Sequence, residues 1–319
     1  MFLRARSSRV RAASTAFAGV LALGFLDVAL VSAQDLEPRA YSASPVGANF
    51  LVGSYSWSGG SVLFDPTLPI ANVHADVQGF VVGAGHSFNL FGDLALVTAA
   101  IPYALAHVTG DVQEQAAEVD RSGLADARFK LSVNLRGNPA MTPAEFAAAP
   151  RRTIVGASIS LSAPVGQYYE TKLVNLGTHR WALKPEIGIS HPEGAWTFDG
   201  YVGGWFFTDN QNFYPGDSMR TQDPVFALQA HVSYAFKPRL WGAFDATWYH
   251  GGSARVDDGP PSSAESNSRI GLTLSLPVGS RYSLKVAGTS GVVARTGTNF
   301  TTFAVAWQAL WLNPRWSGR

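Results

Sequence analysis

Three residues of this chain have the types that a hydrolytic triad requires, and their spacing could bring them together. His231 and Ser233 are two residues apart in an alternating segment, so their side chains point to the same face of a strand. If Phe236 opposes Leu240 across the turn that follows, His231 faces Asp245 on the next strand. No recognisable oxyanion-hole loop accompanies them. The favoured interpretation is therefore a cross-strand His–Asp pair without a catalytic role.

Charged residues recur at alternate positions of several other segments, where their neighbours in the chain are apolar or small. Lys184 and Glu186 share a face in this way, and the lysine could bind a solute carboxylate or pair with the glutamate. We expect ten such side chains to face one interior and to be candidates for a solute path. They are Asp126, Arg128, Lys130, Lys184, Glu186, Asp199, His231, Asp245, Arg269 and Lys285.

The elements that must position these side chains are β-strands, because apolar and polar residues alternate over whole segments. The breaks between the segments are in turn short and long, which is typical of a transmembrane β-barrel with periplasmic turns and external loops. An even strand number would leave both termini in the periplasm. We predict twelve strands: Asn49–Trp57, Ala75–Phe88, Leu94–Leu105, Ala125–Leu135, Thr153–Ala163, Arg180–Ser190, Trp196–Phe207, Val225–Phe236, Leu240–His250, Arg269–Leu276, Tyr282–Ser290 and Phe300–Trp311.

Some local features depart from this regular pattern. Pro102 and Pro185 lie inside predicted strands, and each removes a ladder donor, which predicts a bulge or a strand end there. The break at 136–152 is long although it falls on the periplasmic side, and it contains a weak helical pattern at 143–149. The five long external loops are expected at 59–74, 108–124, 164–179, 208–224 and 251–267.

The apolar face of the predicted strands has the aromatic residues expected of a barrel in lipid. One group, Trp196, Phe236, Tyr282 and Trp311, falls near one rim, and another, Trp57, Trp181, Phe206 and Trp248, falls near the other. Charged residues on the lipid face would cost roughly 2–4 kcal/mol for each Arg or Lys at mid-depth, so the polar face lines the lumen. We predict an all-β fold, an antiparallel transmembrane β-barrel of about twelve strands. A soluble β-sandwich is the alternative.

The first 33 residues have the pattern of a secretory signal peptide: a basic start, an apolar run and small residues at a cleavage site. The rival interpretation is a single membrane anchor, although Asp27 would be costly in lipid. We predict a cleaved signal peptide over 1–33, a periplasmic N-terminal segment over 34–48 and an outer-membrane barrel over 49–319.

Composition excludes several classes of partner. The chain has 24 Lys and Arg against 23 Asp and Glu, so it gives no reason to expect nucleic acid binding. It has no Cys, which excludes disulfides and thiolate metal sites. Its seven His are scattered without metal-ligand spacing, and it has no glycine-rich phosphate or dinucleotide loop. We therefore expect neither a metal nor a cofactor.

Four stretches resemble a known family of outer-membrane transporters associated with the meta-cleavage pathway of phenol degradation. They are Ile101-Pro102-Tyr103, Ser122 to Arg128, Asn175 to Gly188 and Gln222 to Trp241. The resemblance covers nearly the whole chain after residue 33. It implies an outer-membrane barrel of a Gram-negative bacterium and an association with aromatic catabolism, without fixing a substrate.

Three hypotheses of function follow. The first is a channel that passes small solutes, including hydrophobic or aromatic compounds, by passive diffusion. The second is a closed barrel with a structural or adhesive role. The third is an outer-membrane hydrolase that uses His231, Ser233 and Asp245. This is the least favoured of the three, and we expect no enzymatic activity. The expected partners are outer-membrane lipid and a small solute, and the oligomeric state stays open.

Overall fold

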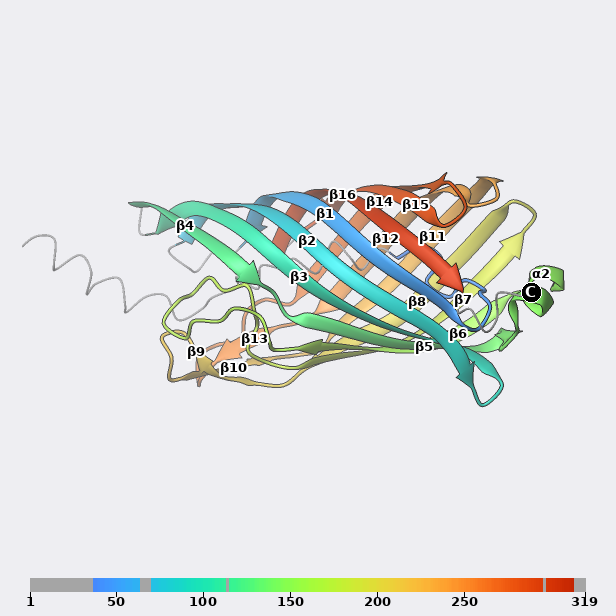
Figure 1. Cartoon of the computed structure of the whole chain (residues 1–319). Coiled ribbons are helices and arrows are strands. Elements are labelled where there is room, and N and C mark those ends of the chain that lie inside the picture. Colours follow the sequence, from blue (N-terminus) through green and yellow to red (C-terminus); the bar gives the residue numbers. More distant parts are fainter. Residues whose placement is uncertain (1–36, 64–69, 113–114, 295–296, 313–319) are drawn as a thin grey trace, which may run out of the picture.

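The computed structural model describes residues 37–63, 70–112, 115–294 and 297–312, and the predicted signal peptide lies outside them. One antiparallel sheet forms a closed ring, because β1 pairs with β16 and β2 pairs with both β1 and β3, so the described residues form a barrel (Figure 1). β4 and β5 both pair with β3 and together occupy one place, which gives the predicted twelve strands. The wall consists of β1 (Ala48–Leu63), β2 (Ile70–Leu90), β3 (Asp93–Val112), β4 (Gln115–Leu124), β5 (Ala127–Pro139), β6 (Ile154–Ala163), β7 (Ala182–Glu193), β8 (Trp196–Phe207), β11 (Val225–Lys237), β12 (Leu240–Gly251), β14 (Glu265–Val278), β15 (Tyr282–Val293) and β16 (Gly297–Leu312).

The prediction for Pro102 is confirmed by the break between β4 and β5. The partners of β3 change from Ala100↔Arg128 to Tyr103↔Leu124, so the facing strand contains one extra residue. The prediction for Pro185 is wrong. It pairs with Ile159 of β6, and its ladder with β8 is interrupted without any change of register. A missing N–H on one side is therefore tolerated inside an otherwise continuous strand.

The strands and loops extend further at one end of the barrel than at the other. The predicted loop at 108–124 is instead a hairpin, in which β3 continues to Val112 and β4 returns from Gln115. The apolar/polar alternation is weak in this hairpin, because its outward side chains above the membrane, such as Asp120, are polar. A small sheet of β9 (Asn210–Phe213), β10 (Ser218–Gln222) and β13 (Ala254–Val256) lies at the same end (Figure 1).

Helix α2 (Pro143–Ala148) lies at the opposite end, where the short turns are (Figure 1). It confirms the helical pattern in the long break at 136–152. Thr142 and Glu145 form a capping box, in which each side chain bonds the other residue's backbone N–H. The backbone and side chain of Thr142 lower the pKa of Glu145. Outer-membrane barrels typically have short turns on the periplasmic side, so we assign this end to the periplasm.

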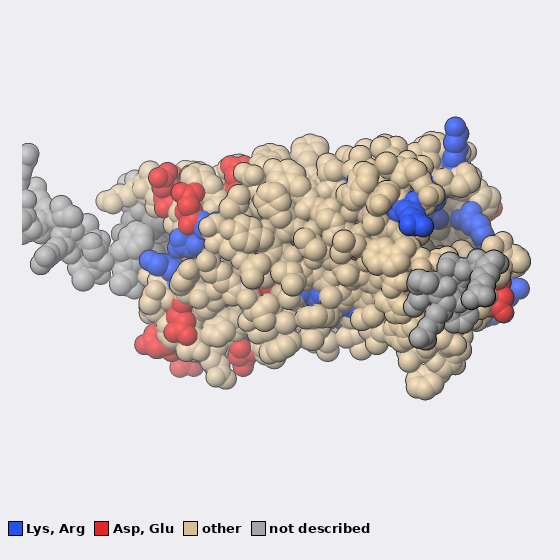
Figure 2. Space-filling view, in the orientation of Figure 1, with Lys and Arg blue, Asp and Glu red and all other residues tan. Residues whose placement is uncertain are grey.

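The outer wall is apolar around the middle of the barrel, and charged side chains gather at the two ends (Figure 2). Large side chains such as Val82, Leu272 and Phe303 are exposed there. All eight predicted rim aromatics are exposed as well. Among the described residues, no helix is long and apolar enough to cross a membrane.

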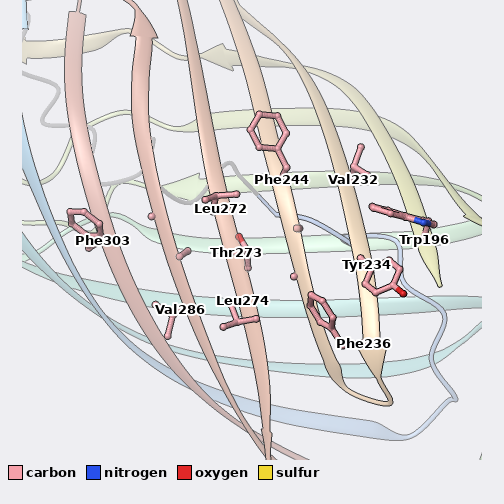
Figure 3. Close-up of a pocket in the computed structure, with 14 residues that line it drawn as sticks. Trp196, Val232, Tyr234, Phe236, Phe244, Leu272, Thr273, Leu274, Val286 and Phe303 are labelled. Atoms are coloured by element: carbon pink, nitrogen blue, oxygen red, sulfur yellow. The ribbon is translucent and has the colours of Figure 1, made fainter.

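A hollow of about 550 Å³ lies in this outer wall, on strands β8, β11, β12 and β14–β16 (Figure 3). Its rim includes the outward side chains Val232, Phe244, Leu274 and Val286, and small residues such as Gly242 form part of its lining. Because the outward face of these strands meets lipid, the hollow belongs to the membrane-facing surface. The candidate site is on the other face of the wall.

Candidate functional site

The inner face of the wall holds all ten predicted side chains. Arg128 and Lys130 alternate with the exposed Phe129, and Lys184 and Glu186 are buried on either side of Pro185. Asp126, Asp199, His231, Asp245 and Arg269 are also buried, and Lys285 is half-buried. The structure places them in the lumen, and their role in a solute path is taken up below.

Residues 37–41, part of the stretch 34–48 that we expected to be a periplasmic N-terminal segment, lie against the inner wall of the barrel. The Glu37 carboxylate lies 2.9 Å from Nζ of Lys130. The backbone N–H of Arg39 donates to Asp199 at 3.3 Å, and its guanidinium lies 5.2 Å from the ring centroid of Trp241. Inward charges of the wall, Lys130 and Asp199, therefore hold a segment that has few apolar residues of its own.

The charge of Lys130 decides the ionisation of Glu37. Desolvation raises the pKa of this carboxyl, but the Lys130 charge and hydrogen bond lower it to about 2. Glu37 is therefore ionised at neutral pH.

Tyr41 of this segment is almost completely enclosed, with 1% of its surface exposed. Its hydroxyl donates to Glu186 at 3.2 Å and lies 3.1 Å from the Ser158 hydroxyl. Its ring meets that of Tyr201 edge-on, with centroids 5.3 Å apart. On the wall side the ring lies against Gly156 of β6.

A second inward segment is the loop between β6 and β7, residues 164–181. Its Val174 and Leu176 belong to a buried apolar cluster with inward residues of β1, β2, β3 and β16. Asp126, at the break between β4 and β5, accepts hydrogen bonds from the backbone of Gly166 and from the backbone and hydroxyl of Thr178. The loop therefore covers the inner wall at the external end, and Asp126 anchors it.

Between the two inward segments the lumen combines cations with aromatic rings. The Lys184 ammonium lies 3.1 Å from Glu186, whose carboxylate also accepts from Gln229. Arg128 and Lys184 lie over the ring of Trp205, at 5.3 and 5.7 Å, and Lys285 lies 5.7 Å from Trp241. The alternative we raised for Lys184, pairing with Glu186, is the one that the structure shows.

His231 and Asp245 face each other as predicted, although at the turn Lys237 rather than Phe236 pairs with Leu240, after a register shift between Ala235 and Lys237. Nδ1 of His231 lies 2.7 Å from Asp245, and Thr273 donates to the other carboxylate oxygen. Among the described residues, Nε2 of His231 has no hydrogen-bond partner, so it makes no hydrogen bond with the Ser233 hydroxyl. The parts of a triad are close, but the serine–histidine bond that would activate the nucleophile is not formed.

Arg269 connects β15 and β16 by hydrogen bonds to both strands. Their ladder runs from Tyr282↔Ala309 to Thr289↔Thr302. Just beyond, the Arg269 guanidinium donates to the Thr289 hydroxyl and to the carbonyl of Phe300, both at 3.1 Å. No group of three or more His, Asp or Glu in the described parts of the chain could hold a metal ion.

Comparison with known proteins agrees with this architecture. Residues 46–307 match the model of a family described as "Putative MetA-pathway of phenol degradation". The chain belongs to this family. It is an outer-membrane β-barrel of the Gram-negative type. None of the curated proteins matches the chain.

Two solved structures show the same fold at low sequence identity. An outer membrane channel from Pseudomonas putida F1 has a TM-score of 0.74 and 19% identity, over 86% of this chain and all of that one. The β domain of the Bordetella autotransporter BrkA has a TM-score of 0.51 and 10% identity, over 83% of this chain and all of that one.

Sequence reasoning missed Glu37, Arg39 and Tyr41, because a short segment before the first strand shows no period. One signal was present in the wall. Gly156 and Gly188 fall on inward positions of neighbouring predicted strands, and small residues at such positions allow another group to approach closely.

Proposed function

We propose that the barrel is a passive channel for small solutes, including hydrophobic and aromatic compounds. The observation that carries this proposal is the middle of the lumen, where cationic groups lie over the rings of Trp205 and Trp241. On such a lining, the ring of an aromatic solute could stack on an indole, and an acidic substituent of the solute could pair with a cation. The description of the Pseudomonas relative as an outer membrane channel and the family's link to phenol degradation support the same function.

The solute path runs along the ten inward residues named from the sequence. Lys184 is central, because it lies beside both Glu186 and the ring of Trp205. An aromatic acid that stacks on the indole would bring its carboxylate to this ammonium. Passage then requires only that the two inward segments leave room.

The test is single-channel recording of the refolded chain in a planar bilayer, with and without benzoate. We expect a steady conductance that benzoate blocks. Lys184→Gln should weaken the block about tenfold, the loss of one charge-assisted contact. Lys237→Gln, at the exposed end of β11, is the matched control and should leave the block unchanged. A silent bilayer with a verified folded barrel would contradict the proposal.

A closed structural or adhesive barrel is the second candidate, because two inward segments fill parts of the lumen. It predicts no conductance and a phenotype that depends on the external loops. Neither function requires catalysis, and we propose that the protein is not an enzyme. Ser233→Ala should change no esterase or lipase activity of the purified protein.

A further inference from the structure

Tyr41 presents a phenol ring to a recess that the barrel wall has built around it. The recess lies on β6 and β7, where Gly156 and Gly188 are directly paired. A Cβ atom on Gly156 would lie 2.2 Å from the Tyr41 ring, and one on Gly188 would lie 2.4 Å from it. Both distances are far below contact distance. The space for the ring therefore exists because both strands have glycine at this level.

The polar end of the recess matches a phenolic hydroxyl. The next inward pair on the same two strands is Ser158 and Glu186, and both contact Oη of Tyr41. Glu186 is itself fixed, since its other oxygen accepts from Lys184 and Gln229. A carboxylate acceptor beside a hydroxyl selects a neutral group that can donate, and it disfavours a carboxylate in the same place.

The remaining wall of the recess is the ring of Tyr201, which meets Tyr41 at an angle of 71°. The edge-to-face geometry suits an aromatic ring of any origin. Tyr201 is also held in place, because its hydroxyl accepts from the backbone N–H of Ala40. The recess thus recognises a ring and its hydroxyl by separate groups.

We propose that this recess is a binding site for neutral phenols, and that Tyr41 occupies it as a tethered substitute in the resting barrel. A para-alkylphenol has the same shape as the tyrosine side chain and would compete for the same contacts. The inference rests on the proposed channel function and deepens it by naming a solute class. Because the segment before β1 carries Tyr41, a phenol that takes its place also frees residues 37–47 from one of their contacts.

The test is equilibrium binding of 4-fluorophenol, followed by its ¹⁹F NMR signal, to the full barrel in detergent. Tyr41→Ala empties the recess, and we expect it to bind 4-fluorophenol at least tenfold more tightly than the wild type. Tyr41→Phe keeps the ring in place and should bind no more tightly than the wild type. Tyr169→Ala, in an exposed part of the 164–181 loop, is the matched control and should also bind like the wild type.

Adding Gly156→Ala to Tyr41→Ala should abolish the gain, because the new methyl group fills the recess at a position whose nearest neighbour is the Tyr41 ring alone. Adding Ser158→Ala should weaken 4-fluorophenol and leave fluorobenzene unchanged. The proposal is overturned if the folded Tyr41→Ala barrel binds like the wild type, or if Gly156→Ala leaves the gain intact. Binding in detergent does not depend on conduction, so a silent bilayer with tight binding would reject the channel and keep the phenol site.

Discussion

Replacing Asp126 with alanine should release the loop of residues 164–181 from the inner wall. The carboxylate is 4% exposed and accepts three hydrogen bonds from the loop. Two come from Thr178, at 2.9 and 2.6 Å, and one comes from Gly166, at 2.9 Å. The Thr178 hydroxyl also donates to the carbonyl of Arg180, at 3.2 Å, but the backbone N–H groups of Gly166 and Thr178 lose their acceptor when the side chain ends at Cβ.

The size of the effect follows from the number of bonds. Each hydrogen bond to a charged acceptor contributes about 1.5–3 kcal/mol, but water can enter the released site and contributions in one network do not add. We expect docking of the loop to weaken by about 3–4 kcal/mol. At 1.4 kcal/mol for each factor of ten, the undocked population should rise about 100- to 1000-fold. The barrel wall keeps its ladders, so unfolding of the whole protein should change much less.

Trypsin offers a direct assay, because Lys172 lies within the loop and cleavage requires the surrounding chain to leave the wall. Asp126→Ala should be cut at Lys172 much faster than the wild type, and its conductance should rise. Asp126→Asn, which keeps one acceptor, should be intermediate. Asp120→Ala, on the exposed face of β4, is the control. Equal cleavage rates for Asp126→Ala and the wild type, with both barrels folded, would refute the anchoring role.

Three further predictions follow from the described contacts. Since the pKa of Glu37 is lowered to about 2, its pairing with Lys130 stabilises the inserted segment at every pH above the ordinary carboxyl pKa, and this contribution is lost as pH falls toward 2. Conductance recorded against pH should therefore rise only in strong acid. In Glu37→Gln the conductance should be raised at neutral pH. Asp245→Ala leaves the donors of His231 and Thr273 buried without an acceptor and should lower the free energy of unfolding by about 3–5 kcal/mol, measured by urea titration in lipid vesicles; a change below about 1 kcal/mol would contradict this. Leu272→Arg, on the lipid face, should cost about 2–4 kcal/mol in the same titration, and a neutral result would mean that this surface does not meet lipid.

The wall of the barrel could be predicted because strand period is a local property. The segment around Phe226–Phe236 alternates without interruption, and its pairing with β12 places His231 opposite Asp245 as expected. Strand lengths were less predictable. Above the membrane the outward residues become polar, so the hairpin of β3 and β4 shows a pattern that resembles a loop.

The contents of the lumen could not be predicted in the same way. Asp126 was expected to line the interior, and it does, but its partners lie in a loop about fifty residues away that shows no pattern of its own. Likewise Glu186 was expected to face inward, while the Tyr41 hydroxyl that it accepts comes from a segment before the first strand. Such contacts depend on tertiary placement and have no period in the sequence.

The closure of the barrel by its first and last strands has a consequence for assembly. β1 pairs with β16 along its whole length, from Ala48↔Leu312 to Leu63↔Gly297, so the chain must be complete before the cylinder exists. Until then β1 and β15 are open edges that invite aggregation, and the pairing of distant segments is slow. Tyr41 binds to β6, β7 and β8 on the wall across from β1, to which it is joined. It can reach that recess only after the sheet has curved, so its insertion reports a late stage of folding.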